Sequence, residues 1–358
     1  MRKEFFASFF LGALLCGILP SCDDSTEINR VLGLGTEAPV FVSYKAASGT
    51  EIDFQFSVPV KVLGARLIAT HEDQNLELEL ENFSGEYEST IALHLKEDHS
   101  GGKSIIADIL VEDTGGNSLN LLVPVKTRNY RLPSLRLNEV RTEQGTSSKG
   151  KYSIEFIELY TKTEGNLGAM RLFLASMGID EPVYEFPGAE VNANEYITLH
   201  MRTKNGDTVK DELGENTGLS EITVSNEKDV SSTARDLWVP VDTKYLHNTD
   251  VIYLVDQDDL IIDALVIAES PDAWTKNKTL TKAAELLAKQ GAWLDKNGGA
   301  VKSPGYTDAV DSDKTTATRT LCRDEAKTDS NTLSDWYICN TSKATPGAKN
   351  STERYNTK

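Results

Sequence analysis

One stretch near the middle of the chain has the two-residue apolar period of β-strands and constrains the fold more than any other. Leu135, Leu137 and Val140 alternate with polar residues, and a connection rich in glycine and serine, 145–150, leads into Tyr152–Tyr160. This pattern predicts a hairpin with a long loop. The second strand is apolar on both faces, which requires cover on each side or a bulge that shifts the phase. We therefore expect this strand to lie in the centre of a β-sandwich.

A distant segment, Asp335–Asn350 (DWYICNTSKATPGAKN), is expected to close this sandwich with a last strand and an exit turn. The segments NEV and EFIELY of the opening hairpin, Leu167-Gly168, the later run PGAEVNANEYITL and the final TPGAKN together form a pattern that resembles the lamin-tail domain family. The resemblance implies an Ig-like β-sandwich and carries over no catalytic residues. The sequence departs from the family at Thr161, where Asn is usual, and lacks the Trp expected after Leu167-Gly168. The matching positions are Asn138, Glu139, Glu155, Ile157, Glu158, Leu159, Tyr160, Leu167, Gly168, Tyr196, Leu199, Thr345, Pro346, Gly347 and Asn350.

The start of the chain reads as a targeting segment. Arg2 and Lys3 precede an apolar run, Phe5–Leu19, which is short for a membrane-spanning helix and suits a secretory signal. The sequence LPSC, ending at Cys22, resembles the bacterial lipobox. That resemblance implies a signal peptide over 1–21 and acyl chains such as palmitate on Cys22, followed by a flexible tether over 22–37. An ordinary signal peptide or an N-terminal membrane anchor is the alternative.

The rest of the chain predicts two tandem domains. Seven short apolar runs separated by glycine-rich turns predict an Ig-like sandwich over 38–130, similar to bacterial Ig-like modules. A lamin-tail-like sandwich over 131–350, with an insertion around 270–320, and a disordered tail over 351–358 follow. The expected fold class is all-β, with two tandem Ig-like β-sandwiches, the second carrying a helical insertion. The seven runs are two within Pro39–Val62, then Ala65–Thr70, Leu76–Leu80, Tyr87–Leu95, Ser104–Val111 and Leu119–Val125.

One segment has a helical pattern. Thr281–Leu294 presents an apolar face, and Gly291 is expected to end or kink the helix. Trp274 and Trp293 flank this helix, and we expect them to pack it onto the sandwich, although an aromatic pair can also bind carbohydrate. The long polar stretch 205–232 is expected to be an exposed excursion, with a binding loop as the alternative.

Cys322 and Cys339 remain after the predicted processing. Two cysteines in one exported domain usually pair, so a disulfide is expected, with two separate buried thiols as the alternative. A metal or redox site would need closer spacing or a histidine partner in the sequence. The five histidines are scattered without metal-ligand spacing.

Asp256, Asp258 and Asp259 form the most acidic cluster and are weak candidates for a calcium site. The sharp-turn glycine and the later bidentate glutamate of a calcium loop are missing. The surrounding sequence, VIYLVDQDDLIIDALVI, favours a hairpin with Gln257, Asp258 and Asp259 at its tip.

The net charge and the motifs of the chain limit the functions that it can have. With 55 acidic and 37 basic residues the formal charge is −18, which disfavours nucleic acid as a partner. Because the sequence shows no nucleophile elbow, phosphate loop or zinc-protease motif, we expect no enzyme and no cofactor. The leading hypothesis is a non-enzymatic, adhesin-like or scaffolding protein of the bacterial cell envelope. It would be anchored in the membrane through lipid on Cys22, at the outer membrane or cell surface rather than the inner membrane, with an unknown protein or glycan partner. The alternatives are an accessory domain of an extracellular hydrolase or nuclease, and a calcium-dependent adhesin.

Overall fold

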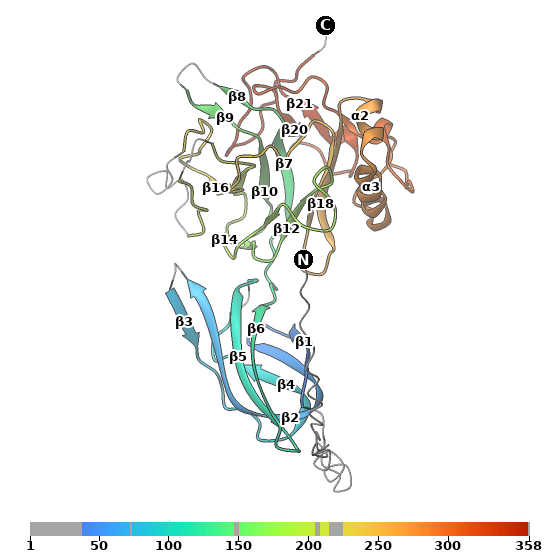
Figure 1. Cartoon of the computed structure of the whole chain (residues 1–358). Coiled ribbons are helices and arrows are strands. Elements are labelled where there is room, and N and C mark those ends of the chain that lie inside the picture. Colours follow the sequence, from blue (N-terminus) through green and yellow to red (C-terminus); the bar gives the residue numbers. More distant parts are fainter. Residues whose placement is uncertain are drawn as a thin grey trace, which may run out of the picture.

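The computed structural model describes residues 38–71, 74–99, 101–146, 150–204, 208–214 and 225–356. The expected signal peptide and tether, including Cys22, lie outside these residues. Strands dominate the described part, so the expected all-β class is confirmed. The chain has two hydrophobic cores, one within residues 52–125 and one within 135–336. The two units that contain them lie end to end in Figure 1.

The first unit is one sheet of six strands in the order β1-β2-β5-β6, with β3 and β4 also pairing with β2. All the pairs in this sheet are antiparallel. The sheet therefore depends on β2, which contacts four other strands. The strands are β1 (Phe41–Ala46), β2 (Glu51–His71), β3 (Gln74–Leu78), β4 (Glu88–His94), β5 (Ser104–Asp113) and β6 (Ser118–Lys126).

Two of the seven expected strands are a single strand in the structure. β2 covers both the second run within Pro39–Val62 and the run Ala65–Thr70. Its register shifts between Gln55 and Val60 and again between Val62 and Gly64. Its first part pairs with β1 and β4 and its last part with β3 and β5. Bulges of this kind bend a strand, so the sheet curves around its own core instead of being divided by a turn.

The second unit contains two larger sheets whose side chains meet in one core. The first has the order β16-β15-β10-β7-β20-β21 and the second β13-β12-β17-β18-β19; β8 pairs with β9, and β11 with β14. The strands are β7 (Leu135–Arg141), β8 (Gly145–Thr146), β9 (Tyr152–Ser153), β10 (Phe156–Thr161), β11 (Gly165–Asn166), β12 (Arg171–Leu174), β13 (Tyr184–Glu185), β14 (Glu190–Val191), β15 (Tyr196–His200), β16 (Arg235–Trp238), β17 (Asp250–Val255), β18 (Ile261–Ala268), β19 (Val310–Asp311), β20 (Leu321–Arg323) and β21 (Trp336–Ile338).

The opening strand of the hairpin, β7, contains a bulge, whereas the sequence places the phase change in the second strand. Ile157 of β10 lies opposite Val140, and Leu159 lies opposite Leu137, so Asn138 has no opposite residue. This extra residue lets Leu137 and Val140, three positions apart, both enter the core, where each is fully buried. The strand β10 lies between β7 and β15, so its predicted central position is confirmed.

The closing segment returns to this hairpin as expected. β21 pairs with β20, and β20 pairs with β7, which brings the end of the chain beside its opening strand. The expected disordered tail needs correction. Arg354 forms a β-bridge with Cys339, and the Tyr355 N–H donates to the Ile338 carbonyl at 2.8 Å. Residues 351–356 are ordered because they satisfy backbone groups of β21 that would otherwise form an open edge.

The insertion contains α2 (Pro271–Lys276) and α3 (Lys278–Gln290). Gly291 ends α3 with a φ of 70°, as the sequence predicts, so the expected extension to Leu294 is wrong. Trp274 and Trp293 are both buried in the core, which supports the packing role. Among the described helices, none is long and apolar enough to cross a membrane.

Candidate functional site

The predicted acidic cluster forms the tip of the β17–β18 hairpin. Asp256 accepts hydrogen bonds from the backbone N–H groups of Asp258 and Leu260, at 2.8 and 2.9 Å, through a single carboxylate oxygen. Asp259 adopts the left-handed conformation with a φ of 62°. The hairpin predicted from the sequence is therefore formed, and Asp256 stabilises its turn.

The other two carboxylates of this cluster are engaged by arginines. Asp258 forms a two-pronged ion pair with Arg128 from the link after β6, and this contact lowers the pKa of Asp258. Asp259 pairs with Arg171 of β12 at 2.7 Å. The three weak calcium candidates therefore have other contacts: Asp256 stabilises the turn, Asp259 pairs within the second unit, and Asp258 ties the hairpin tip to the link between the units.

That junction also contains a close backbone contact. The Asn129 side chain donates to the carbonyl oxygens of Asn166 and Gly168 at 2.7 and 2.8 Å, and both bonds are buried. Gly168 packs directly on Gly101, because a Cβ at position 168 would lie 1.6 Å from the Gly101 carbonyl oxygen. A side chain at Gly168 would therefore prevent the two units from docking as they do.

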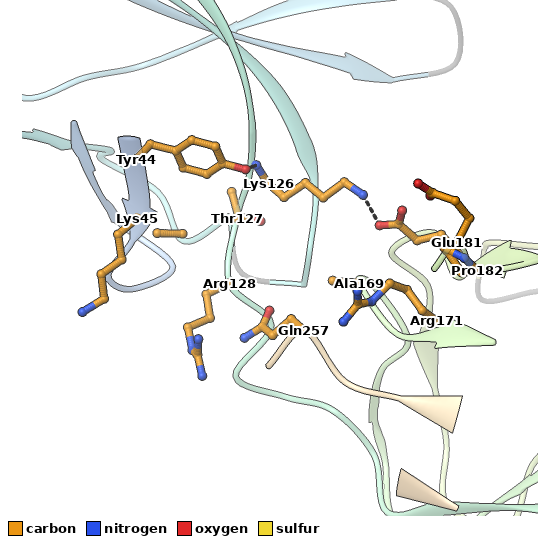
Figure 2. A pocket seen from close by; sticks show the side chains of 12 residues that line it. Tyr44, Lys45, Lys126, Thr127, Arg128, Ala169, Arg171, Glu181, Pro182 and Gln257 are labelled. Atoms are coloured by element: carbon orange, nitrogen blue, oxygen red, sulfur yellow. Dashed lines mark hydrogen bonds and ion pairs between the residues drawn. The ribbon is translucent and has the colours of Figure 1, made fainter. Parts of the chain in front are cut away.

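A pocket of about 510 Å³ opens beside this junction (Figure 2). Tyr44 and Lys45 of β1 lie on one side of it, and Arg171 and Pro182 of the second unit lie on the other (Figure 2). Neither unit forms it alone, and its volume falls in the range of ligand-binding clefts. The lining residues are Tyr44, Lys45, Ala46, Lys126, Thr127, Arg128, Ala169, Arg171, Glu181, Pro182, Glu185 and Gln257.

The pocket is cationic although the chain as a whole is acidic. Four lysines and arginines line it against two glutamates. Lys126 forms an ion pair with Glu185 across the junction, drawn as a dashed line in Figure 2. Lys45 differs from the other cations, since its ammonium group has no ion-pair or hydrogen-bond partner in the described part of the chain. It is therefore free to meet an anionic ligand.

A second polar cluster is buried where the opening hairpin meets the closing segment. Glu139 of β7 is fully buried and accepts hydrogen bonds from the backbone N–H and the hydroxyl of Thr345, at 3.0 and 3.2 Å. The Thr320 hydroxyl donates to its other oxygen. Burial raises the pKa of Glu139 to about 7 despite these donors.

Glu158 of β10 lies directly opposite Glu139 and is also fully buried. It accepts from the Gly347 backbone N–H and from the Asn138 side chain, the latter at 2.9 Å. Burial, together with the nearby Glu139, raises the pKa of Glu158 well above its usual value. Asn350 completes the contact by donating to the Asn138 carbonyl at 2.9 Å. The polar motif residues thus attach the exit turn to the opening strands.

Cys322 and Cys339 lie in this cluster as free thiols, so the expected disulfide is not formed. Cys322 lies opposite Tyr337, and Cys339 lies two residues further on, so the cysteines are diagonal neighbours across the β20–β21 pair. Their sulfur atoms lie within 4.8 Å of each other without the S–S bond of about 2 Å that a disulfide has. The hydrogen bond between the thiols raises the pKa of Cys322 and lowers that of Cys339 to about 6.

Comparisons with known proteins complete the description. A family model described as "TP_1001_2nd: protein second domain" matches residues 133–338. No curated protein matches the chain. Three solved structures are similar to it. One is the N-terminal part of the bacterial S-layer protein SbsC, with 14% identity, a TM-score of 0.23, and coverage of 47% of this chain and 40% of that chain.

The second structure is a DUF4876 family protein from Bacteroides thetaiotaomicron VPI-5482, with 10% identity, a TM-score of 0.28, and coverage of 77% of this chain and 90% of that chain. The third is domains 1–6 of SbsC, with 11% identity, a TM-score of 0.23, and coverage of 64% and 40%. The chain therefore matches less than half of either SbsC structure. At TM-scores this low, the three likenesses carry no argument about function.

Sequence reasoning missed the cationic pocket and the position of Glu139 beside the two thiols. The lining residues of the pocket come from β1, the link after β6, and three parts of the second unit, and no local sequence pattern connects them. Glu139 was identified only as a motif position. The clearest available signal was the pair of basic residues, Lys126 and Arg128, just before the domain link in an otherwise acidic chain.

Proposed function

The chain belongs to the TP_1001_2nd family, whose model spans residues 133–338, and from this premise we propose that it is a non-enzymatic binding protein of a bacterial cell envelope. The lipobox-like sequence ending at Cys22 supports attachment to the membrane by lipid, at the outer membrane or cell surface. The family domain would be held away from the membrane by the tether and the first β-unit.

The pocket at the junction carries this proposal. Both units contribute cations to it: Lys45, Lys126 and Arg128 come from the first unit and its link, and Arg171 comes from the second. Arg128 and Arg171 are already fixed by ion pairs. We propose a glycan bearing carboxylate groups as the ligand, because such a molecule presents negative charge to the cations and a sugar face to Tyr44.

Calorimetric titration with acidic oligosaccharides, against neutral ones of the same length, tests this function. We expect the acidic ligands alone to bind, with an affinity that falls as salt increases. The substitution Lys45→Ala should weaken binding about five- to tenfold, the effect of losing roughly 1 to 1.4 kcal/mol of charge-assisted contact.

Lys96→Ala is the matched control, because Lys96 is an exposed lysine of the same unit that pairs with Glu79 and does not line the pocket. Equal losses from the two substitutions would show that overall charge, and not the pocket, is responsible. Equal binding of acidic and neutral sugars, or binding of an acidic peptide in their place, would overturn the proposed ligand.

A further inference from the structure

The two free thiols, Glu139 and Thr320 form a compact set of possible metal ligands inside the second unit. One oxygen of Glu139 and the sulfur atoms of Cys322 and Cys339 all lie within 4.8 Å of one another, and all three residues are fully buried. Within the part of the chain that the structure describes, this is the one such group of three histidine, cysteine or acidic residues.

The Thr320 hydroxyl supplies a fourth donor atom at suitable distances. It lies 3.1 Å from Cys339 Sγ and 3.6 Å from Cys322 Sγ, and it contacts Glu139 directly. A tetrahedral zinc site with bonds of 2.0 to 2.3 Å has edges of about 3.3 to 3.8 Å. Movements of about 1 Å would therefore place the four donor atoms at the corners of a tetrahedron.

We propose that Glu139, Cys322 and Cys339, with the Thr320 hydroxyl as a neutral fourth ligand, bind one zinc ion. Two thiolates favour zinc over calcium or magnesium, and the tetrahedral arrangement agrees with that choice. On binding, zinc exchanges its bound waters for two sulfurs and two oxygens, and any protons that the two thiols and the Glu139 carboxyl still hold pass to solvent. Two Zn–S bonds and two Zn–O bonds form, and no oxidation occurs.

The surroundings of the cluster suit a bound cation. Thr345 holds the second Glu139 oxygen through its N–H and its hydroxyl, which leaves the first oxygen directed to the cluster. Contacts of this kind fix the orientation of a metal ligand, and losing one typically weakens metal affinity 10- to 100-fold.

The site would connect the beginning of the second unit to its end. Glu139 lies on β7, Cys322 on β20, and Cys339 just after β21. A zinc ion would therefore fasten the closing segment to the opening strand, which a bond between the two cysteines alone would not do, since neither lies on β7. Since these ligands meet only in the folded chain, we expect the ion to bind as the unit folds.

The test is the zinc content of the full-length chain, purified in detergent with a non-chelating reductant and measured by mass spectrometry. We expect about one zinc per chain, and replacement by cobalt should give thiolate-to-cobalt charge-transfer absorption. Cys322→Ala with Cys339→Ala should abolish both signals, and Glu139→Gln should weaken zinc affinity at least about tenfold.

Asp250→Asn is the matched control, because Asp250 is also a fully buried carboxylate that accepts from the N–H and hydroxyl of one residue, Ser176, but lies in the other sheet. It should keep the zinc. Folded, reduced wild-type chain without stoichiometric zinc would overturn the proposal, as would a chain that is 2 Da lighter from a disulfide. The zinc content and the mass are both measured on the unmodified chain, so these two tests remain valid even if a variant fails to fold.

Discussion

Replacing Gly168 by alanine tests whether the two units are held in one fixed arrangement. The added Cβ would lie 1.6 Å from the carbonyl oxygen of Gly101 and 2.7 Å from its carbonyl carbon. Both are backbone atoms, so no side-chain rotation can relieve the clash. The units must move apart at this point, and the pocket beside it must change shape.

The size of the effect follows from the contacts that separation breaks. The Asn129 side chain would lose its buried hydrogen bonds to the carbonyl oxygens of Asn166 and Gly168. At about 1 kcal/mol each, these bonds amount to about 2 kcal/mol, or roughly 30-fold in the ratio of separated to docked molecules. The ion pair between Lys126 and Glu185 is partly exposed and adds little.

Limited trypsin digestion measures this ratio, because cleavage of the link at Arg128 or Arg131 requires the units to separate. We expect cleavage of Gly168→Ala to be about 30-fold faster than that of the wild type. Gly188→Ala should have a smaller effect, since its Cβ would lie 3.1 Å from the Gly101 oxygen, and Gly64→Ala, with nothing within 4 Å, should have none. Unchanged cleavage of a folded Gly168→Ala variant would refute the docking contact.

Three further predictions concern the anchor, a buried acid and the insertion. Cys22→Ala should release the chain from the membrane fraction and abolish labelling by radioactive palmitate; continued labelling would contradict the anchor. Burial raises the pKa of Asp250 to about 7, above its unfolded value of about 3.9, so its stabilising contribution is complete below the unfolded pKa and is lost as pH rises through 7. The melting temperature should therefore fall between pH 5 and 8, and Asp250→Asn should make this fall with pH less steep. An equally steep fall in the variant would contradict the role of Asp250. Trp293→Ala should cost about 3 to 5 kcal/mol in denaturant unfolding, because Trp293 is 1% exposed and its indole N–H donates to the Asp308 carbonyl; a loss below 1 kcal/mol would contradict its core position.

Local periodicity predicted the elements whose structure depends on nearby residues. The central position of β10, the β17–β18 hairpin and the end of α3 at Gly291 all follow from the spacing of apolar residues and from turn chemistry. Residues three positions apart on a regular strand point to opposite faces. Leu137 and Val140 both lie in the core, so β7 requires a bulge between them.

Features that depend on distant partners could not be predicted in the same way. Glu139 meets Cys322 and Thr345 only because of the sheet order, and the cysteine register that disfavours a disulfide depends on which residues of β20 and β21 lie opposite each other. The sequence does not predict that β2 is continuous, because Gly64 and Pro59 suggest a break in the strand. In the structure both residues lie within one strand that contains bulges. The pocket needs the docking of both units.

The exit turn has a consequence for the nascent chain. Thr345 donates to Glu139 across 206 residues of sequence, and at about 5 to 20 residues per second this separation corresponds to roughly 10 to 40 s of ribosomal synthesis. During that interval β7 lacks its neighbour β20. Charged residues on unpaired strands discourage aggregation with other chains. The two glutamates that are costly to bury in the finished protein would therefore protect the waiting strands until their last partners are made.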